Sequence, residues 1–234
     1  MNERLYPPRT HTSYYHLMEL RLALESISNK YFLGNHELVL VDLGCGTKPY
    51  LPIFEKHLAE YIGVDLPSNS LADTFVTPDG TIPLLDAFAD VVISTQVLEH
   101  TIDPISYLKE CHRLLKPNGL LILSTHGYWP YHPDPIDYWR WTSSGVKKII
   151  RDADFEIIEL RGLMGLAPTA LQLFQDSIIR KFNRTIQPIL IYVFQFLIRF
   201  LDKKYPEETK EKDACTFVIV ARQTQKQLTD NFGF

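Results

Sequence analysis

Two glycines directly after an apolar run have the spacing that points most clearly to chemistry. The run 38–43 is almost continuously apolar, which is typical of a strand buried inside a parallel sheet. Gly44 and Gly46 follow it, and glycine allows both a tight turn and the close approach of a ligand to the backbone. Asp65 ends the next apolar segment, where a carboxylate can accept hydrogen bonds from both hydroxyls of a ribose. The combination predicts a site for an adenosine-type ligand.

The residues after the turn distinguish between classes of adenosine ligand. A dinucleotide fingerprint needs a third glycine three positions after Gly46, and this chain has Pro49 there. A phosphate-binding loop needs a Gly-Lys-Ser/Thr sequence, which does not follow the turn. An adenosine ligand without a phosphate fits better, and S-adenosylmethionine is the common one. A nucleotide-linked oxidoreductase is therefore disfavoured.

The elements that must position these residues alternate between strands and helices. Apolar periodicity predicts helices over 13–31 and 50–59, while Asp103 and Thr142 are expected to cap helices that run to 116 and to about 151. Strands are expected at 38–43, 61–65, 73–77, 90–95, 120–124, 155–160 and 216–222. This order predicts an α/β fold, a doubly wound, mostly parallel seven-stranded Rossmann-like sheet with a helical insertion before the last strand.

Composition sets the class of protein. The chain has 234 residues, 45% apolar residues and a net charge of −4, which suits one globular domain and argues against nucleic-acid binding. We divide this domain into an N-terminal helical segment 1–37, an α/β core 38–161, a helical insertion 162–214 and a last strand with a C-terminal tail 215–234. Cysteines at 45, 111 and 215 are too far apart for a metal site, and they favour a reducing, cytoplasmic location. No metal ligands are predicted.

A series of motifs follows the first strand in a fixed order. They are Asp42-Leu43-Gly44-Cys45-Gly46, Gly63-Val64-Asp65, Asp79-Gly80 before Ile82-Pro83, Ala89-Asp90-Val91-Val92, Val97-Leu98-Glu99-His100 and the segment from Leu108 to Leu120. As a set they resemble the motifs of class I S-adenosylmethionine-dependent methyltransferases, in the style of the broad group that includes the ubiquinone-biosynthesis-type and methyltransferase domain 11-like enzymes. The resemblance covers roughly residues 38–160 and a last strand at 215–222.

The resemblance implies a role for each matched residue in holding the cofactor. From the methionine half onward, the expected residues are Asp42, Gly44, Cys45 and Gly46, then Asp65 and Leu66 at the ribose, Asp79 and Gly80 at the adenine, and Thr95 and Gln96 at the sulfonium end. The spacing between Asp79 and Pro83 is one residue shorter than in the family pattern.

The segment 126–141 follows the expected fifth strand and is the region where the methyl acceptor is expected. His126 is the first candidate general base and His132 the second, since histidine titrates near neutral pH. Each also has a purely structural interpretation, as a strand-end residue or as part of a proline-rich turn. The aromatic side chains around Trp129 either pack the acceptor or form core. Residues 137–142 resemble a segment found in methyltransferases of cell-surface glycan pathways.

The insertion 162–214 contains an unusually apolar stretch, Ile186–Leu201. The polar residues of this stretch and the residue that follows it fall within a sector of about 120° on a helical wheel. They are Gln187, Gln195, Arg199 and Asp202. Three interpretations remain open: a helix buried against the domain or in a homodimer interface, a peripheral contact with a membrane interface, or a cap over a pocket for a long apolar substrate. The stretch is too short and too interrupted to indicate a membrane span.

These observations predict an S-adenosylmethionine-dependent methyltransferase. Its acceptor is expected to be a small molecule, a glycan or a lipid-linked intermediate, and the reaction is expected to be an in-line methyl transfer in which alignment supplies much of the rate. The expected location is cytoplasmic, with peripheral contact at the inner face of a membrane as an extension. The alternative is a non-catalytic cofactor-binding partner or scaffold of the same fold.

Overall fold

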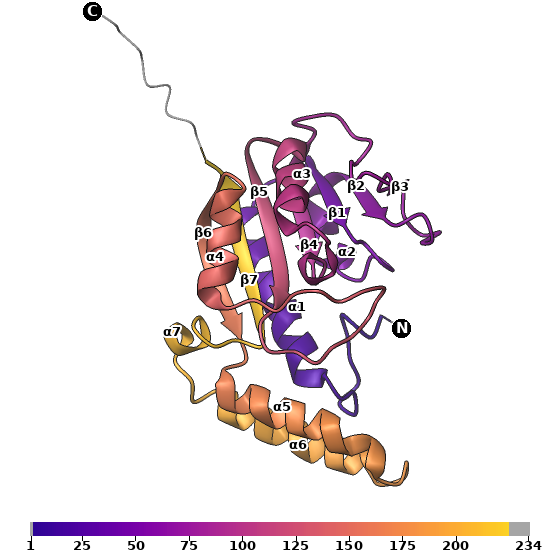
Figure 1. Ribbon diagram of the computed structural model, residues 1–234, viewed down its shortest axis with the longest axis vertical. Helices are drawn as coiled ribbons and strands as arrows, with labels where there is room; N and C mark the ends of the chain where they lie inside the picture. Colours follow the sequence, from indigo (N-terminus) through magenta and orange to yellow (C-terminus); the bar gives the residue numbers. More distant parts are fainter. Residues whose placement is uncertain (1, 225–234) are drawn as a thin grey trace, which may run out of the picture.

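Seven strands form one sheet in the order β3-β2-β1-β4-β5-β7-β6 in the computed structural model, which describes residues 2–224 (Figure 1). The strands are β1 (Leu38–Leu43), β2 (Leu58–Asp65), β3 (Thr74–Phe75), β4 (Ala89–Thr95), β5 (Leu115–His126), β6 (Phe155–Leu163) and β7 (Thr216–Gln223). β7 runs antiparallel to both of its neighbours, β5 and β6, and the other pairs of neighbouring strands are parallel. The expected fold class is confirmed. The end of the expected C-terminal tail, 225–234, lies outside the described residues.

Helices cover both faces of the sheet because each buries one apolar stripe against it. On one face, α1 (Tyr14–Tyr31) and α2 (Leu51–Phe54) pack against β1, β4, β5 and β7. On the other face, α3 (Pro104–Leu114) and α4 (Ser143–Asp152) complete a second core. Both predicted caps are confirmed, since Asp103 accepts hydrogen bonds from the first turn of α3 and Thr142 accepts one from Gly145.

Two expected boundaries are wrong. The helix expected over 50–59 ends early: α2 passes into a 3₁₀ turn, η1 (Glu55–His57), and β2 then begins at Leu58. Leu58 pairs with Leu38 at the start of β1, so sheet pairing overrides the helical pattern. The helix expected to run to 116 ends at Leu114, and residues 117–119 lie within β5. Leu115 already pairs with Ala89, and the residues up to Leu120 form an irregularity in the ladder.

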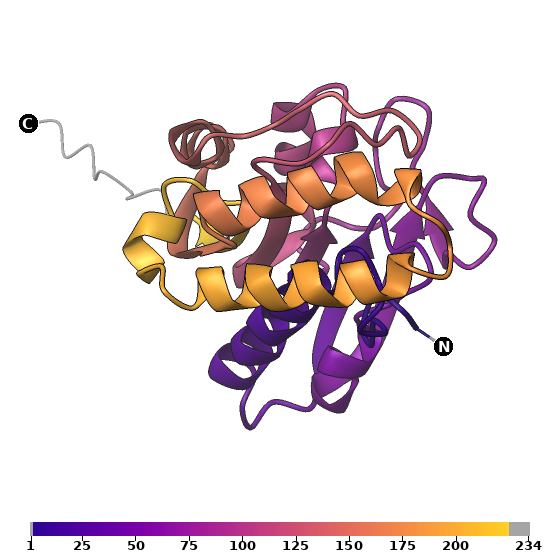
Figure 2. The same ribbon diagram turned by 90° about the horizontal axis from the view of Figure 1, so that it is seen from below.

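The insertion between β6 and β7 is a helical hairpin. It consists of α5 (Leu166–Ile178), the 3₁₀ turn η3 (Ile179–Lys181) and α6 (Gln187–Asp202), and the short α7 (Glu207–Lys210) follows. Because α5 begins three residues after β6 ends, the hairpin lies at the carboxyl edge of the parallel strands. Figure 2 shows α5 and α6 side by side across this end of the sheet. None of the helices within residues 2–224 has the length and hydropathy that crossing a bilayer requires.

The hairpin buries several of its polar side chains and leaves many of its large apolar side chains exposed. Gln195 and Asp202 of α6 are almost completely buried. Tyr15 donates to both of them, its backbone N–H to Gln195 and its hydroxyl to Asp202, and the carbonyl of Thr12 accepts from Gln195. The domain therefore buries one side of α6, which combines the apolar Ile191 and Ile198 with Gln195 and Asp202. The three interpretations of the apolar stretch stay predictions.

Candidate functional site

The turn after β1 is fixed by contacts that require glycine. Gly44 has φ +70° and Gly46 has φ +52°, conformations that other residues adopt at a cost. A Cβ on Gly44 would lie 2.4 Å from a methyl carbon of Val97, so the turn packs directly against the segment that follows β4. Between the glycines, Cys45 is buried, with its thiol directed toward Asp65.

Asp65 is oriented by three donors at the end of β2. One carboxylate oxygen accepts from the backbone N–H of Leu66 at 2.7 Å, and the other accepts from the N–H of Gly46 and the side-chain amide of Asn69, both at 2.8 Å. Asn69 also donates to the carbonyl of Gly46 at 2.8 Å. Asn69 thus links Asp65 to the glycine turn. The only signal for Asn69 in the sequence is that an amide side chain follows shortly after the acid that ends the strand.

Asp42 is a buried acid whose carboxylate can accept more hydrogen bonds than the structure gives it. Its Oδ2 atom accepts a hydrogen bond from the hydroxyl of Tyr61 at 2.5 Å, whereas Oδ1 is buried and has no partner within the described residues. Burial raises the pKa of Asp42 to about 7, although the bond from Tyr61 opposes the shift. A buried acceptor without a donor is costly, and an ammonium group on a ligand is a suitable partner. Sequence reasoning missed Tyr61.

The other expected cofactor residues follow the carboxyl ends of β3 and β4. Thr95 is buried at the end of β4, and Gln96 has φ +58° while its N–H donates to Ser124. Asp79 lies in an exposed turn after β3, where it accepts from the hydroxyls of Thr77 and Thr81. The bond from Thr77 is the main cause that lowers the pKa of Asp79. Its role at an adenine stays a prediction, as do the other individual cofactor assignments.

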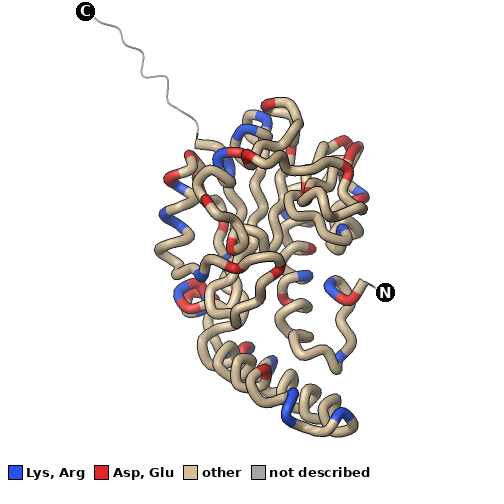
Figure 3. The backbone as a smooth tube through the Cα atoms, turned by 45° about the vertical axis from the view of Figure 1, so that its right-hand side comes forward, with Lys and Arg blue, Asp and Glu red and all other residues tan. Residues whose placement is uncertain are grey.

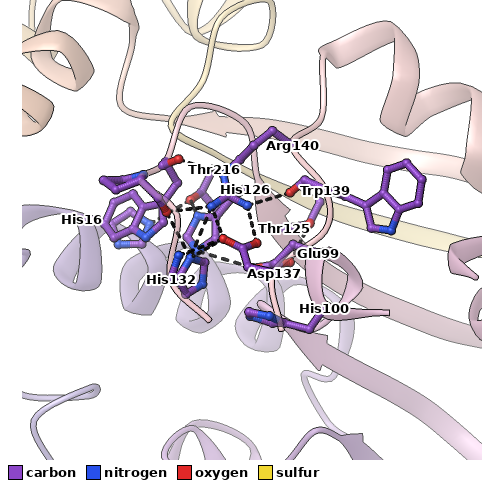
Figure 4. Close-up of polar contacts among 12 residues, drawn as sticks. His16, Glu99, His100, Thr125, His126, His132, Asp137, Trp139, Arg140 and Thr216 are labelled. Carbon is purple, nitrogen blue, oxygen red and sulfur yellow. Dashed lines mark hydrogen bonds and ion pairs between the residues drawn. The ribbon is translucent and has the colours of Figure 1, made fainter. Parts of the chain in front are cut away.

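His126, the first candidate base, lies at the end of β5 and is almost completely buried. Its Nδ1 atom is 3.1 Å from the hydroxyl of Thr216, its Nε2 atom is 3.4 Å from Oε1 of Glu99, and its ring stacks on Trp129 with centroids 4.7 Å apart (Figure 4). Burial, reinforced by neighbouring His16, holds the pKa of His126 well below its usual range. The imidazole is therefore neutral at neutral pH, and burial disfavours its protonated form.

His132 is half-buried in the loop after β5 and belongs to the same cluster. Its Nδ1 atom lies 3.2 Å from a carboxylate oxygen of Asp137, and Arg140 binds both oxygens of that carboxylate, at 2.6 and 2.5 Å. Burial alone would raise the pKa of Asp137, but the bond from Arg140 outweighs it and lowers that pKa to about 2. The segment 137–140 therefore positions His132, an effect that spacing alone did not indicate.

A cavity lies beside this cluster. It has a volume of about 290 Å³ and is lined in part by Trp129, Arg140, Trp141, Lys212 and Phe217. Trp129 thus stacks on the candidate base, His126, and also lines the cavity. Aromatic faces with two cationic side chains suit an acceptor that combines a ring or chain with polar groups.

Comparisons with known proteins agree with this arrangement. A family described as a methyltransferase domain matches residues 14–160. The ubiquinone biosynthesis O-methyltransferase of Cereibacter sphaeroides is 35% identical over 101 residues, 38% of this chain and 41% of that protein. A probable S-adenosylmethionine-dependent methyltransferase of Mycolicibacterium smegmatis is 29% identical over 111 residues, 45% of this chain and 40% of that protein. The chain spans about two fifths of the length of these curated relatives.

A solved structure supports the fold. The phosphoethanolamine N-methyltransferase 2 of Haemonchus contortus, in complex with S-adenosyl-L-methionine, aligns with a TM-score of 0.57 and 14% sequence identity. The alignment covers 87% of this chain and 53% of that one. At this level of identity the likeness concerns the fold alone.

Proposed function

We propose that this chain is an enzyme that transfers a methyl group from S-adenosylmethionine. The reason is that it belongs to the family of class I S-adenosylmethionine-dependent methyltransferases. The observation that carries the proposal is the pair of acids at the glycine turn. Asp65 is held in place by Gly46 and Asn69, and Asp42 has a buried oxygen to which no group of residues 2–224 donates. We assign Asp65 to the ribose hydroxyls and Asp42 to the ammonium group of the methionine half.

The chain's own contribution to the chemistry is alignment and proton removal. When bound, S-adenosylmethionine supplies an electrophilic methyl group, so the enzyme needs chiefly to hold the acceptor in line with it. His126 is neutral and buried next to Thr216 and Trp129, and we propose that it accepts the proton of an acceptor hydroxyl. Thr216 fixes the ring orientation, and Trp129 keeps water from one face of it.

The hairpin favours an acceptor that resides in or at a lipid bilayer. Apolar residues of α6 with helical spacing form one outward face, which we call the apolar face; they are Ile189, Tyr192, Val193, Phe196, Leu197 and Phe200. Ile189 and Phe196 are 65% and 61% exposed. A contiguous group of exposed apolar side chains such as this one generally marks an interaction surface. The hairpin lies at the same edge of the sheet as His126, so docking there would bring the site close to the bilayer.

The charged residues around the apolar face indicate which kind of surface the hairpin would bind. Between residues 166 and 204 the acids are Asp176 and Asp202; the first is half-buried against two glutamines and the second is buried. Basic residues occupy the two ends of the hairpin (Figure 3); they are Arg180, Lys181 and Arg184 at one end and Lys203 and Lys204 at the other. Apolar side chains between basic ends fit a bilayer with anionic headgroups.

Vesicle binding tests the surface. We expect the full chain to float with phosphatidylglycerol-containing vesicles and much less with neutral ones. A double variant, Ile189→Ser with Phe196→Ser, should lower partitioning at least tenfold, since burying one such side chain contributes about 1.5–3 kcal/mol. Leu33→Ser is the matched control, because Leu33 is 81% exposed away from the hairpin. A stable dimer that ignores vesicles and dissociates in the double variant would contradict the membrane proposal and support the homodimer interpretation.

Labelled methyl transfer tests the activity. We expect the purified chain, given methyl-labelled cofactor and cell extracts, to place label in the organic-solvent phase rather than in the aqueous or protein fractions. The expected signal disappears on boiling, and competition by S-adenosylhomocysteine should suppress it. Cofactor binding without transfer to any fraction would favour the alternative, a non-catalytic partner or scaffold. Label confined to the aqueous phase would retain the enzyme and reject the lipid acceptor.

A further inference from the structure

Three potential metal ligands converge beside the candidate base. Glu99 and His100 belong to the 3₁₀ turn η2 (Leu98–His100) that follows β4, and His132 belongs to the loop after β5. One possible ligand atom from each of them lies within 4.8 Å of the others. The labelled side chains in Figure 4 occupy one region although they come from separate segments. Because the third residue lies far along the chain from the other two, the spacing of the sequence did not indicate this group.

Each histidine is held by a hydrogen-bond acceptor at one ring nitrogen. Nδ1 of His100 lies 2.7 Å from the carbonyl of Ile136. Nδ1 of His132 lies 3.2 Å from both the Asp137 carboxylate and the Pro130 carbonyl, closer than the donor Arg140 at 3.3 Å. A histidine that donates from Nδ1 presents the lone pair of Nε2, which is the arrangement that outer-sphere carboxylates and carbonyls give to metal-binding histidines.

Glu99 supplies the independent observation. Its side chain is completely buried, and its Oε2 atom accepts from the hydroxyl of Thr125 at 2.8 Å. Its Oε1 atom accepts no hydrogen bond within the described residues, and Nε2 of His126 lies 3.4 Å from it. A buried carboxylate with a free oxygen is expensive unless a cation neutralises it.

We propose that Glu99, His100 and His132 bind a divalent transition-metal ion of the zinc class. Two imidazoles and one carboxylate form a ligand set that suits zinc and its neighbours better than magnesium or calcium, which prefer oxygen ligands. Three protein ligands leave a coordination position for another molecule, as in catalytic rather than structural zinc sites. That position lies near His126, so an acceptor oxygen is a suitable occupant. Metal binding itself does not depend on the proposed methyl transfer.

Metal titration of the full chain tests this site. After removal of metals with a chelator, we expect the wild type to bind one equivalent of Zn²⁺, and Co²⁺ to give the visible absorption of a coordinated ion. His100→Gln and His132→Gln should each weaken Zn²⁺ binding by at least tenfold. Asp137→Asn should weaken it about tenfold or more, because outer partners of metal-binding histidines have effects of that size. Circular dichroism of each apo variant checks that it is folded.

A matched histidine outside the cluster provides the control. His36→Gln removes an exposed histidine that contacts the carbonyl of Lys56, and it should leave the Zn²⁺ affinity unchanged. If His132→Gln disturbs its loop, His100→Gln decides the question, because His100 lies in the short turn after β4. Wild type that takes up no metal, or that binds Zn²⁺ as tightly as both histidine variants do, would overturn the proposal.

Discussion

Asp65→Ala is expected to weaken the binding of S-adenosylhomocysteine by about 10- to 100-fold in calorimetric titration. A hydrogen bond to a charged group contributes about 1.5–3 kcal/mol, and about 1.4 kcal/mol corresponds to a tenfold change in affinity. The substitution also removes the acceptor for the N–H of Gly46, so the glycine turn loses its tie to β2. Both effects act in the same direction, which makes this one of the two largest effects we predict.

Two further variants separate the contact between Asp65 and the ligand from the hydrogen bonds that orient Asp65. Asn69→Ala leaves the carboxylate of Asp65 in place but removes a donor that orients it, so we expect a smaller loss, several-fold. Glu60→Ala changes an exposed acid on the same strand and should leave affinity unchanged. A folded wild type that binds no S-adenosylhomocysteine, or an Asp65→Ala variant that binds it as the wild type does, would remove the basis of the proposed function.

The core of the fold could be predicted because its signals are local. The apolar run of β1, the cap at Asp103 and the cap at Thr142 each depend on a few neighbouring residues, and all three features are present. The start of β2 at Leu58 depends instead on pairing with Leu38, and the early start of β5 depends on pairing with Ala89. Partners so distant in sequence leave no local pattern from which a boundary can be read.

The hairpin shows a different limit of sequence reasoning. A helical wheel correctly groups Gln195 and Asp202 of α6 on one side, but it does not say which side faces the protein. The inward side includes polar residues beside Ile191 and Ile198 because backbone groups of the N-terminal segment need partners there. The carbonyl of Thr12 accepts from three glutamine side chains, and the N–H of Tyr15 donates to Gln195. These demands arise only once the chain is folded.

The candidate site was only partly predictable for the same reason. Motif spacing indicated Asp42, Asp65 and His126, since each ends or follows a strand whose position the pattern predicts. It did not indicate Tyr61, whose hydroxyl binds Asp42, or the approach of Glu99 to His126 across two strands. Such pairs are set by the register of the parallel ladder, in which β4 and β5 end side by side.

Asp42→Asn is expected to stabilise the protein at neutral pH while it abolishes tight cofactor binding. The folded-state pKa of Asp42 is raised to about 7 by burial, with Tyr61 and Lys48 opposing and Asp65 reinforcing the shift. A raised carboxyl pKa means that folding favours the protonated form. The wild type therefore loses stability as pH rises from about 4 to about 7, and the loss stays constant above that range.

Asparagine removes this cost because it cannot ionise, and its carbonyl can still accept from Tyr61. The pKa of Asp42 is raised from 3.8 to about 7, and each pKa unit corresponds to about 1.4 kcal/mol. We therefore expect a gain of up to about 4 kcal/mol in the free energy of unfolding at pH 8, vanishing near pH 4. Chemical denaturation at the two pH values measures it. Wild-type affinity for S-adenosylhomocysteine should meanwhile fall below pH 7, as the carboxylate that faces the ligand's ammonium group becomes protonated.

The two halves of this prediction depend on the same buried oxygen and can fail separately. A variant that is no more stable at pH 8 than the wild type would mean that Asp42 is already neutralised in the folded protein, without any ligand. A variant that keeps wild-type affinity would mean that the ammonium group binds elsewhere along the edge of the sheet. If both results follow as expected, Asp42 is an acid kept at the expense of stability because the cofactor requires its charge, which is how functional sites commonly depart from the most stable sequence.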